Sequence, residues 1–107
     1  MAKKHVFVTM KNEITGDPKQ EFKVEVVRSA TVYSVMTELQ KVKKLSIEFQ
    51  QVAPNQIVTA INEVHNDYEE KKQWYFYING SDPGHLTLNT AVPNDGDTID
   101  WKYEHRD

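Results

Sequence analysis

Two aromatic-rich runs in the last third of the chain constrain the fold most strongly. Residues 74–78 read Trp-Tyr-Phe-Tyr-Ile and are followed by Asn79-Gly80; residues 99–103 read Ile-Asp-Trp-Lys-Tyr and follow Asp95-Gly96-Asp97. Aromatic and β-branched residues between polar-glycine turns are typical of β-strands. We therefore expect strands over residues 74–78 and 98–103, joined to the rest of a small sheet.

The start of the chain predicts a β-hairpin. Residues 5–10 and 21–27 alternate between apolar and polar side chains, with Val6, Val8 and Met10 sharing one face of the first run. The segment Thr15-Gly16-Asp17-Pro18 between them combines residues that favour turns. The two runs are expected to pair through this turn.

A helix is expected next, beginning after Thr31 and ending near Lys44. Thr31 is a suitable N-cap because its hydroxyl can accept a hydrogen bond from a free N–H of the first turn. Apolar residues then recur at helical spacing and predict one buried stripe: Val32, Val35, Met36, Leu39 and Val42.

Further short strands are expected at residues 45–49 and 56–64, separated by Pro54-Asn55, and a brief extended piece at 86–88. A right-handed crossover from the hairpin through the helix would lay that helix across one face of the sheet. The predicted fold is therefore α+β, a β-grasp (ubiquitin-like) domain whose mixed sheet carries one helix on one face. It spans residues 1–107 as a single domain, and a cystatin-like α+β layout is the alternative.

Period-two alternation sorts the strand side chains into two faces. The core face should hold Phe22, Val24, Val26, Trp74, Phe76, Ile78, Ile99, Trp101 and Tyr103. The opposite face should hold His5, Phe7, Tyr75, Tyr77, Asp100 and Lys102. One helix covers one face only, so aromatic residues on the other face would form an interaction patch if the strand order brings them together.

Charge and composition exclude several classes of function. The net charge is −3, and residues 51–107 carry ten acidic against four basic residues, so the aromatic half is acidic and nucleic-acid binding is not expected. The chain has no cysteine, which excludes disulfides and thiolate chemistry. No apolar run reaches the ~18 residues of a membrane span. The first residues carry no export signal, which fits either a cytoplasmic protein or a mature exported one.

No catalytic or metal-binding constellation is visible. The four histidines do not pair at ligand spacing, and the oxygen-bearing residues 94–100 lack the order of a calcium loop. No nucleophile lies beside a base in the sequence, and no pattern indicates a pair of carboxylates in a catalytic cleft. We therefore expect no catalytic residue, no metal and no enzyme activity.

The C-terminal pattern resembles a known family. Residues 74–80, Gly84, the segment Pro93–Ile99 and Trp101-Lys102-Tyr103 are similar to the C-terminal domain of transcobalamin and intrinsic factor. A bacterial family of that kind, a domain of unknown function found mostly in secreted or surface proteins, has the same outline. The resemblance extends over roughly residues 5 to 105, is specific in the last 34, and implies a β-grasp fold.

The residues that carry the resemblance divide into structural and ligand-binding candidates. The structural set shapes turns and core, because Asn-Gly and Asp-Gly pairs adopt positive φ and cap nearby N–H groups: Trp74, Asn79, Gly80, Gly84, Asp95, Gly96, Asp97, Trp101 and Tyr103. Aromatic side chains suit flat apolar ligands, and the expected contacts are Phe7, Tyr75, Tyr77 and His85.

The resemblance implies a non-enzymatic ligand-binding module for a corrinoid or another flat small molecule. Cobalamin would be a ligand rather than a required cofactor, and in the vitamin carriers it lies between this domain and a large helical one, so a partner would complete the site. The alternative is a protein–protein interaction or adhesive domain of a bacterial cell-surface protein. The implied location is extracellular or at the cell surface, with the cytoplasm left open.

Overall fold

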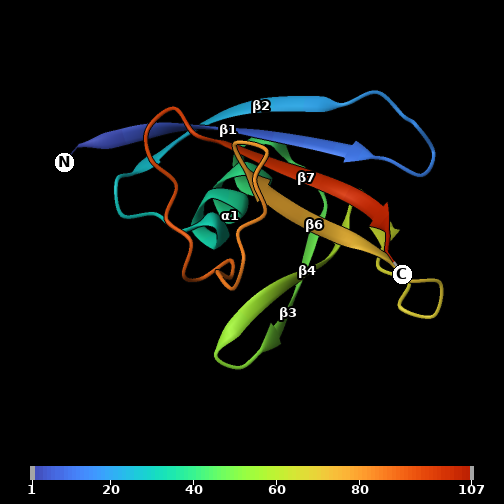
Figure 1. The fold of residues 1–107 in the computed structure, drawn as a ribbon. Coiled ribbons are helices and arrows are strands. Elements are labelled where there is room, and N and C mark those ends of the chain that lie inside the picture. The colour runs from blue at the N-terminus through green and yellow to red at the C-terminus, as the bar shows by residue number, and fades with distance from the viewer. Residues whose placement is uncertain (1, 107) are drawn as a thin grey trace.

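The computed structural model describes residues 2–106 and contains one helix and strands that form two sheets (Figure 1). Along the chain the elements are β1 (Lys3–Asn12), β2 (Gln20–Val27), α1 (Val32–Lys43), β3 (Ile47–Val52), β4 (Asn55–Ile61), β5 (Val64–His65), β6 (Lys72–Ile78) and β7 (Thr98–His105). Among these residues no helix has the length and apolar character needed to cross a membrane.

The large sheet has the strand order β2-β1-β7-β6. β1 pairs antiparallel with β2 through Val6 and Val24, parallel with β7 through Val8 and Ile99, and β7 pairs antiparallel with β6. The predicted hairpin and the mixed character of the sheet are confirmed. The first and last strands of the chain are therefore neighbours at its centre.

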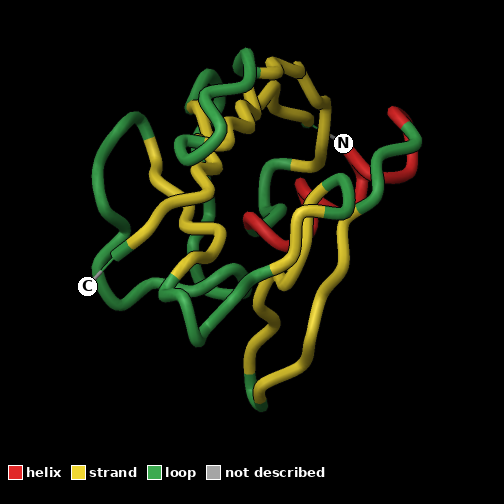
Figure 2. The backbone as a smooth tube through the Cα atoms, turned by 90° about the vertical axis from the view of Figure 1, so that its right-hand side faces the viewer, coloured by secondary structure: helices red, strands yellow, loops and turns green. Residues whose placement is uncertain are grey.

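The expectation of a single sheet is wrong, because β3, β4 and β5 form a small sheet of their own. A bulge shifts the β3–β4 register between Glu48 and Phe49, and positive φ angles at Asn62 and Glu63 turn the chain back after β4. β5 has only two residues, so the ladder ends there. Figure 2 shows the β3–β4 hairpin projecting from the body as a separate arm.

Helix α1 begins and ends where the sequence predicts. The Thr31 hydroxyl accepts a hydrogen bond from the Ser34 N–H at 3.2 Å, and Lys44 closes the helix in the left-handed conformation at φ 55°. Four residues of the predicted stripe are buried, but Val42 is 53% exposed. The last turn of α1 therefore runs past the edge of the core.

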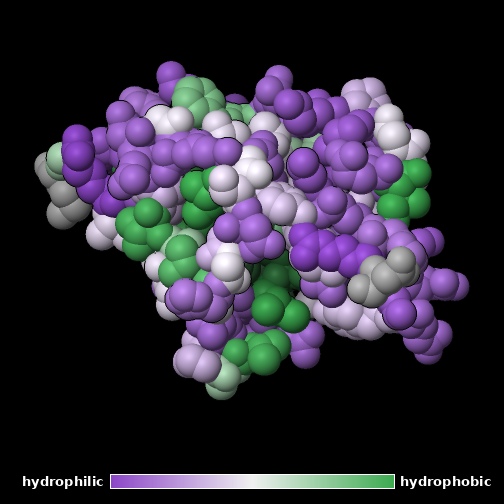
Figure 3. Space-filling view, viewed as in Figure 1, coloured by the Kyte–Doolittle hydropathy of each residue, from purple (hydrophilic) through white to green (hydrophobic). Residues whose placement is uncertain are grey.

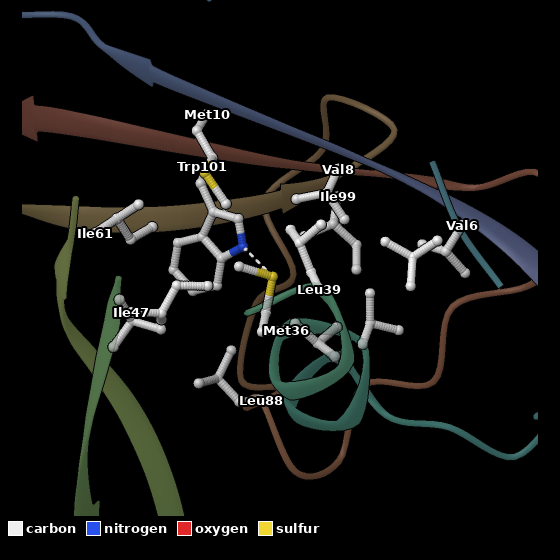
Figure 4. Close-up of a cluster of buried hydrophobic side chains, with 14 of the residues drawn as sticks. Val6, Val8, Met10, Met36, Leu39, Ile47, Ile61, Leu88, Ile99 and Trp101 are labelled. Carbon is white, nitrogen blue, oxygen red and sulfur yellow. Dashed lines mark hydrogen bonds between the residues drawn. The ribbon is translucent and has the colours of Figure 1, made fainter. Parts of the chain in front are cut away.

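The main core lies between α1 and the large sheet. Figure 4 shows the Trp101 indole directed at Met36, whose sulfur accepts a hydrogen bond from Nε1 at 3.1 Å, with Ile47 and Ile61 of the small sheet closing one side. Burial of each large apolar side chain contributes roughly 1.5–3 kcal/mol. The predicted face assignment is confirmed: Val24, Val26, Trp74, Ile99, Trp101 and Tyr103 are buried, and Phe22, Phe76 and Ile78 are half-buried.

Lys4 breaks the apolar pattern of the covered face, since it shares that face with Val6 and is 2% exposed. Its ammonium donates to the carbonyl oxygen of Ala30 at 3.0 Å and to that of Pro93. Burial away from water lowers the pKa of Lys4 below its usual value. The lysine thus fixes both the entry to α1 and the segment before β7 against β1.

The two turns of the C-terminal pattern lock together. Asn79 and Gly80 both have positive φ, which closes a tight turn after β6. The Asn79 side chain accepts from the Thr98 N–H at 2.9 Å and donates to the Asp97 carboxylate at 3.0 Å. Asp95 accepts from the His5 N–H at 2.8 Å. These hydrogen bonds tie the turn after β6 to the segment before β7 and to the start of β1.

The predicted extended piece at residues 86–88 does not form a strand. Instead the segment between Gly80 and β7 is an irregular loop in which Gly84 has positive φ and donates its N–H to the Asp82 carboxylate. Leu88 is buried, and the Leu88 carbonyl accepts from the Tyr33 N–H of α1 at 2.9 Å. The loop is thereby anchored on the helix.

Candidate binding groove

A groove with a volume of about 420 Å³ lies between β4, β6 and the loop of residues 82–88. Figure 3 shows apolar surface in this region, between β6 and the β3–β4 hairpin. The groove exists because the hairpin projects as a separate arm and leaves a space beside the outer edge of β6. Its apolar lining is Val52, Ile57, Val58, Trp74, Phe76, Leu86, Leu88 and Trp101.

Both tryptophans contribute to the inner wall of the groove. Trp74 and Trp101 are 6% and 2% exposed, and the Phe76 ring packs against the Trp101 ring with centroids 5.4 Å apart. The Trp74 indole N–H donates to the Val64 carbonyl at 2.8 Å, so its polar group is satisfied on the protein side. The half-buried Phe76 ring therefore presents an aromatic surface that the two buried tryptophans back.

Asn66 closes one end of the groove and joins the two sheets. Its Oδ1 accepts from the Trp74 N–H of β6 at 2.9 Å, and its Nδ2 donates to the Val58 carbonyl of β4 at 3.0 Å. The Asn66 N–H also donates to the Thr59 carbonyl at 2.8 Å. One amide side chain thus takes the place of a strand-to-strand ladder at this junction.

The other end of the groove is closed by contacts between β4 and the loop. The Thr87 hydroxyl donates to the Asn55 side chain at 2.9 Å, and the Gln56 N–H donates to the Asn89 side chain at 2.6 Å. These bonds hold residues 82–88 against the start of β4. Leu86 is 42% exposed at the mouth of the groove.

The outer edge of β6 has open backbone groups at Phe76. The Asn79 N–H donates to Thr98 and the Arg106 N–H donates to Lys71, so odd-numbered residues of β6 bond toward β7 and even-numbered ones face outward. Of these, Trp74 donates its N–H to Asn66, and Ile78 pairs with Ser81. Within residues 2–106 the Phe76 N–H and C=O have no partner, and Phe76 lines the groove.

Tyr75 and Tyr77 lie on the open face of the large sheet, as predicted, but in different settings. The Arg106 guanidinium stacks over the Tyr75 ring at 3.6 Å, and both residues line the groove. The Tyr77 hydroxyl donates to Glu104 and accepts from Arg106. Burial, with Glu104 in support, raises the pKa of Tyr77. Tyr77 therefore belongs to a polar network beside the groove.

The other two predicted contacts lie apart from these tyrosines. Phe7 is 40% exposed on β1, where the Lys23 ammonium lies 6.0 Å from its ring, and β7 separates it from β6. His85 is exposed on the loop and does not line the groove. The four residues form no contiguous aromatic patch, and a ligand-binding role for them stays a prediction.

Sequence reasoning did not identify most of the groove residues. Ile57 and Val58 looked like ordinary strand residues, and Leu86 and Leu88 like a short extended piece. The position of β6 at an edge of the large sheet follows from the strand order, which the sequence pattern does not reveal. Among residues 2–106 no group of three or more His, Cys, Asp or Glu side chains is arranged to hold a metal ion.

Over residues 2–106 the fold and the groove define a small α+β domain with one helix, two sheets and an apolar surface site. The chain belongs to the family described as domain of unknown function DUF4430, whose model matches residues 29–105. No curated protein matches the sequence.

Several solved structures share the fold, among them the following two. Haptocorrin in complex with Cbi superposes with a TM-score of 0.85 at 14% identity over 97% of this chain, which spans only 25% of that protein. A candidate metal binding protein from Ruminococcus gnavus ATCC 29149 superposes with a TM-score of 0.74 at 14% identity, over 97% of this chain and 99% of that one. The expected likeness to transcobalamin-type domains is confirmed at the level of the fold.

Proposed function

We propose that this chain is a non-enzymatic ligand-binding module whose site is the groove between β4, β6 and residues 82–88. The observation that carries the proposal is the groove itself, about 420 Å³ in volume, with both tryptophans in its wall. Small-molecule sites are typically apolar clefts of roughly 300–1,000 Å³ with a few fixed polar groups. Here the open backbone of Phe76 and the Arg106 side chain supply such groups.

The ligand class we favour is a flat, largely apolar small molecule, with a corrinoid as the first candidate. The likeness to haptocorrin in complex with Cbi supports this choice. Because the chain spans a quarter of haptocorrin, a second domain or protein would cover the rest of so large a ligand. The strand order β2-β1-β7-β6, with a central parallel pair, supports assignment to the β-grasp class.

A titration with cobinamide tests the proposal directly. Since both tryptophans line the groove, a bound ligand should change their fluorescence, and calorimetry should give the same dissociation constant without optical interference. Leu86→Asp places a charge at the groove mouth and should weaken binding at least tenfold. Ile14→Asp is the matched control, because Ile14 and Leu86 are both 42% exposed and Ile14 lies outside the groove.

The result that would count against the proposal is an absence of binding heat and of fluorescence change up to about 1 mM ligand, a limit that corresponds to roughly −4 kcal/mol. Equal weakening by Leu86→Asp and Ile14→Asp would also contradict it, because the ligand would then not occupy the groove.

A second candidate function is an interaction or adhesive domain of a bacterial cell-surface protein. It is favoured by exposed apolar side chains around the groove. Val52 is 50% exposed and lines the groove together with Phe76, whose backbone groups are open. Such an edge can accept an extended segment of another protein. Protease treatment of intact source cells tests the location, because a surface protein is cleaved while a cytoplasmic marker is spared; protection of both would remove this candidate.

A further inference from the structure

Strand β2 forms the other edge of the large sheet, and its outward backbone groups are unpaired. Phe7 and Glu13 donate their N–H groups to the β7 side, so odd-numbered residues of β1 bond toward β7 and even-numbered ones toward β2. In the antiparallel register Val6 faces Val24, so even-numbered residues of β2 bond inward. Among the described residues, the backbone groups of Glu21, Lys23 and Glu25 have no partner on the outer side.

The side chains along this edge alternate in charge. Lys19, Glu21, Lys23 and Glu25 follow one another at every second position and are all exposed. Glu21, Lys23 and Glu25 belong to β2 and, by period-two alternation, lie on the open face of the sheet, away from α1. Lys19 directly precedes the strand, with its ammonium 3.9 Å from the Glu21 carboxylate. The edge therefore combines unsatisfied backbone donors and acceptors with a repeating pattern of opposite charges.

This pattern is complementary to itself in one antiparallel register. If a second copy of β2 runs antiparallel with Phe22 opposite Phe22, Glu21 lies opposite Lys23 and Lys19 opposite Glu25, and the twofold axis repeats both pairs. Directly opposite charges stabilise antiparallel strands, whereas like charges destabilise them. Every facing pair of charges in this register is attractive.

The neighbouring register is disfavoured by the same charges. When the second copy is displaced so that Lys23 faces Lys23, Glu21 faces Glu25 and every charged pair is repulsive. The register between these two would place Phe22 opposite Lys23, so that outward backbone groups of one strand face inward-bonded groups of the other and no ladder forms. The charges therefore select a register as well as a partner.

Phe22 adds an apolar contact at the twofold axis. It lies on the side of the sheet that α1 covers and is only half-buried within one molecule. In the selected register the two Phe22 residues form a non-hydrogen-bonded pair, whose Cα atoms approach to about 4.5 Å. Facing aromatic residues at such a position stabilise a strand pair. The edge is thus complementary on both faces of the sheet.

We propose that the partner of the β2 edge is a second copy of this chain. The two copies pair antiparallel about Phe22 and form one continuous eight-stranded sheet with both helices on the same face. The two grooves beside β6 lie at the far ends of that sheet and stay open. The interface does not depend on what the groove binds.

The association is expected to be weak and salt-dependent. A contact made by one edge strand from each copy is small compared with the ~1,200–2,000 Å² of stable interfaces. Glu25 already lies 3.3 Å from His5, and Glu21 lies 3.9 Å from Lys19, so part of the charge attraction is satisfied in the single molecule. Exposed charge pairs are also screened by salt.

Two charge variants test the proposal. Lys19→Glu with Lys23→Glu makes the edge wholly acidic, and Glu21→Lys with Glu25→Lys makes it wholly basic. Sedimentation at about 0.5 mM should show self-association of the unchanged chain, none of either variant alone, and a heterodimer when the two variants are mixed. Addition of 0.5 M salt, roughly a 4 Å screening length, should weaken that heterodimer.

Matched controls carry equal charge changes elsewhere. Lys41→Glu with Lys43→Glu on α1, and Glu69→Lys with Glu70→Lys in a loop, alter exposed residues that lie outside β2. Both control variants keep the β2 edge, so each alone, and the two mixed, should associate as strongly as the unchanged chain and no more. The proposal is overturned if the acidic and basic edge variants stay monomeric when mixed, or if each alone associates as well as the unchanged chain. Far-UV circular dichroism verifies that each variant is folded.

Discussion

The two edges of the large sheet differ in how many of their outward backbone N–H and C=O groups have hydrogen-bond partners. At β6 most outward groups are occupied: Asn66 takes the Trp74 N–H, and Ser81 pairs with Ile78. At β2 the outward groups of Glu21, Lys23 and Glu25 are open, and charged side chains flank them. Exposed strand edges invite pairing with other chains and are commonly restrained by charge.

The difference indicates separate tasks for the two edges. The β6 edge is built into the core through Trp74 and leaves one short opening, at Phe76, which lies in the groove. The β2 edge contributes Val24 and Val26 to the core on its covered face, but its outward backbone groups at Glu21, Lys23 and Glu25 are all open, so it can accept another strand. Changes at β6 should therefore affect folding and ligand binding, whereas changes at β2 should affect association.

The largest effect is expected for Trp74→Ala on β6. Trp74 is buried, packs against the Tyr103 ring with centroids 5.3 Å apart and donates to the Val64 carbonyl. Its loss should reduce the free energy of unfolding by about 3–5 kcal/mol. Urea denaturation followed by circular dichroism measures this. Phe22→Ala on the half-buried β2 edge should cost clearly less, and the opposite ranking would refute the comparison.

Asn66→Ala should have the next largest effect. It leaves the Trp74 N–H and the Val58 carbonyl without partners at the junction of the sheets, at a cost of about 1–3 kcal/mol. Urea denaturation again gives the value. Gln51→Ala, at an exposed position of β3, is the control and should be nearly neutral. Equal stability of the two variants would show that Asn66 does not hold the β6 edge.

Alkaline pH should reduce the stability of the fold through tyrosines on the β6 side of the large sheet, because β2 contains no tyrosine. Burial raises the pKa of Tyr77 above 10.0, and Tyr103 is shifted in the same direction. A tyrosine whose folded-state pKa is raised contributes stability below pH 10 that is lost as the pH rises through the folded-state pKa. Tyr77→Phe should therefore reduce the loss of stability above pH 10.

The titration itself provides the measurement for that prediction. Ultraviolet absorbance of tyrosinate should show fewer late-ionising tyrosines in Tyr77→Phe than in the unchanged chain, and thermal unfolding at pH 7 and above pH 10 should give the stability difference. If the variant instead loses a phenol that ionises near the ordinary tyrosine pKa of about 10, the network of Tyr77, Glu104 and Arg106 does not protect the Tyr77 phenol.

The smallest effect on stability is expected for Lys23→Ala on β2. Its side chain is exposed and makes only a distant contact with the Phe7 ring. Such surface substitutions usually change stability by less than about 0.5 kcal/mol. Chemical denaturation at low protein concentration measures it. A cost comparable to that of Asn66→Ala would mean that the β2 edge supports the folded monomer.

Local patterns were sufficient to predict the strands, the helix and the two faces of the large sheet. Thr31 caps α1 through a contact three residues away, and Asn79-Gly80 turns the chain within its own neighbourhood. Trp101 is buried because alternation along its own strand places it there. Each of these features depends on neighbours in the sequence.

The second sheet and the groove depend on contacts that no local pattern reveals. Asn66 joins β4 to β6 through hydrogen bonds that its surrounding charged loop does not predict. Lys4 is buried by Ala30 and Pro93, which are distant in the chain. Val42 has helical spacing but lies beyond the core, because periodicity does not show where the covering strands end.

The parallel pairing of β1 with β7 has a mechanical consequence. The first and last strands run in the same direction, side by side, so their outer ends lie at opposite ends of the sheet (Figure 1). A force that draws these ends apart would load the hydrogen bonds between them together, in shear, rather than opening them one after another. The domain should therefore resist a force that pulls the start of β1 and the end of β7 in opposite directions.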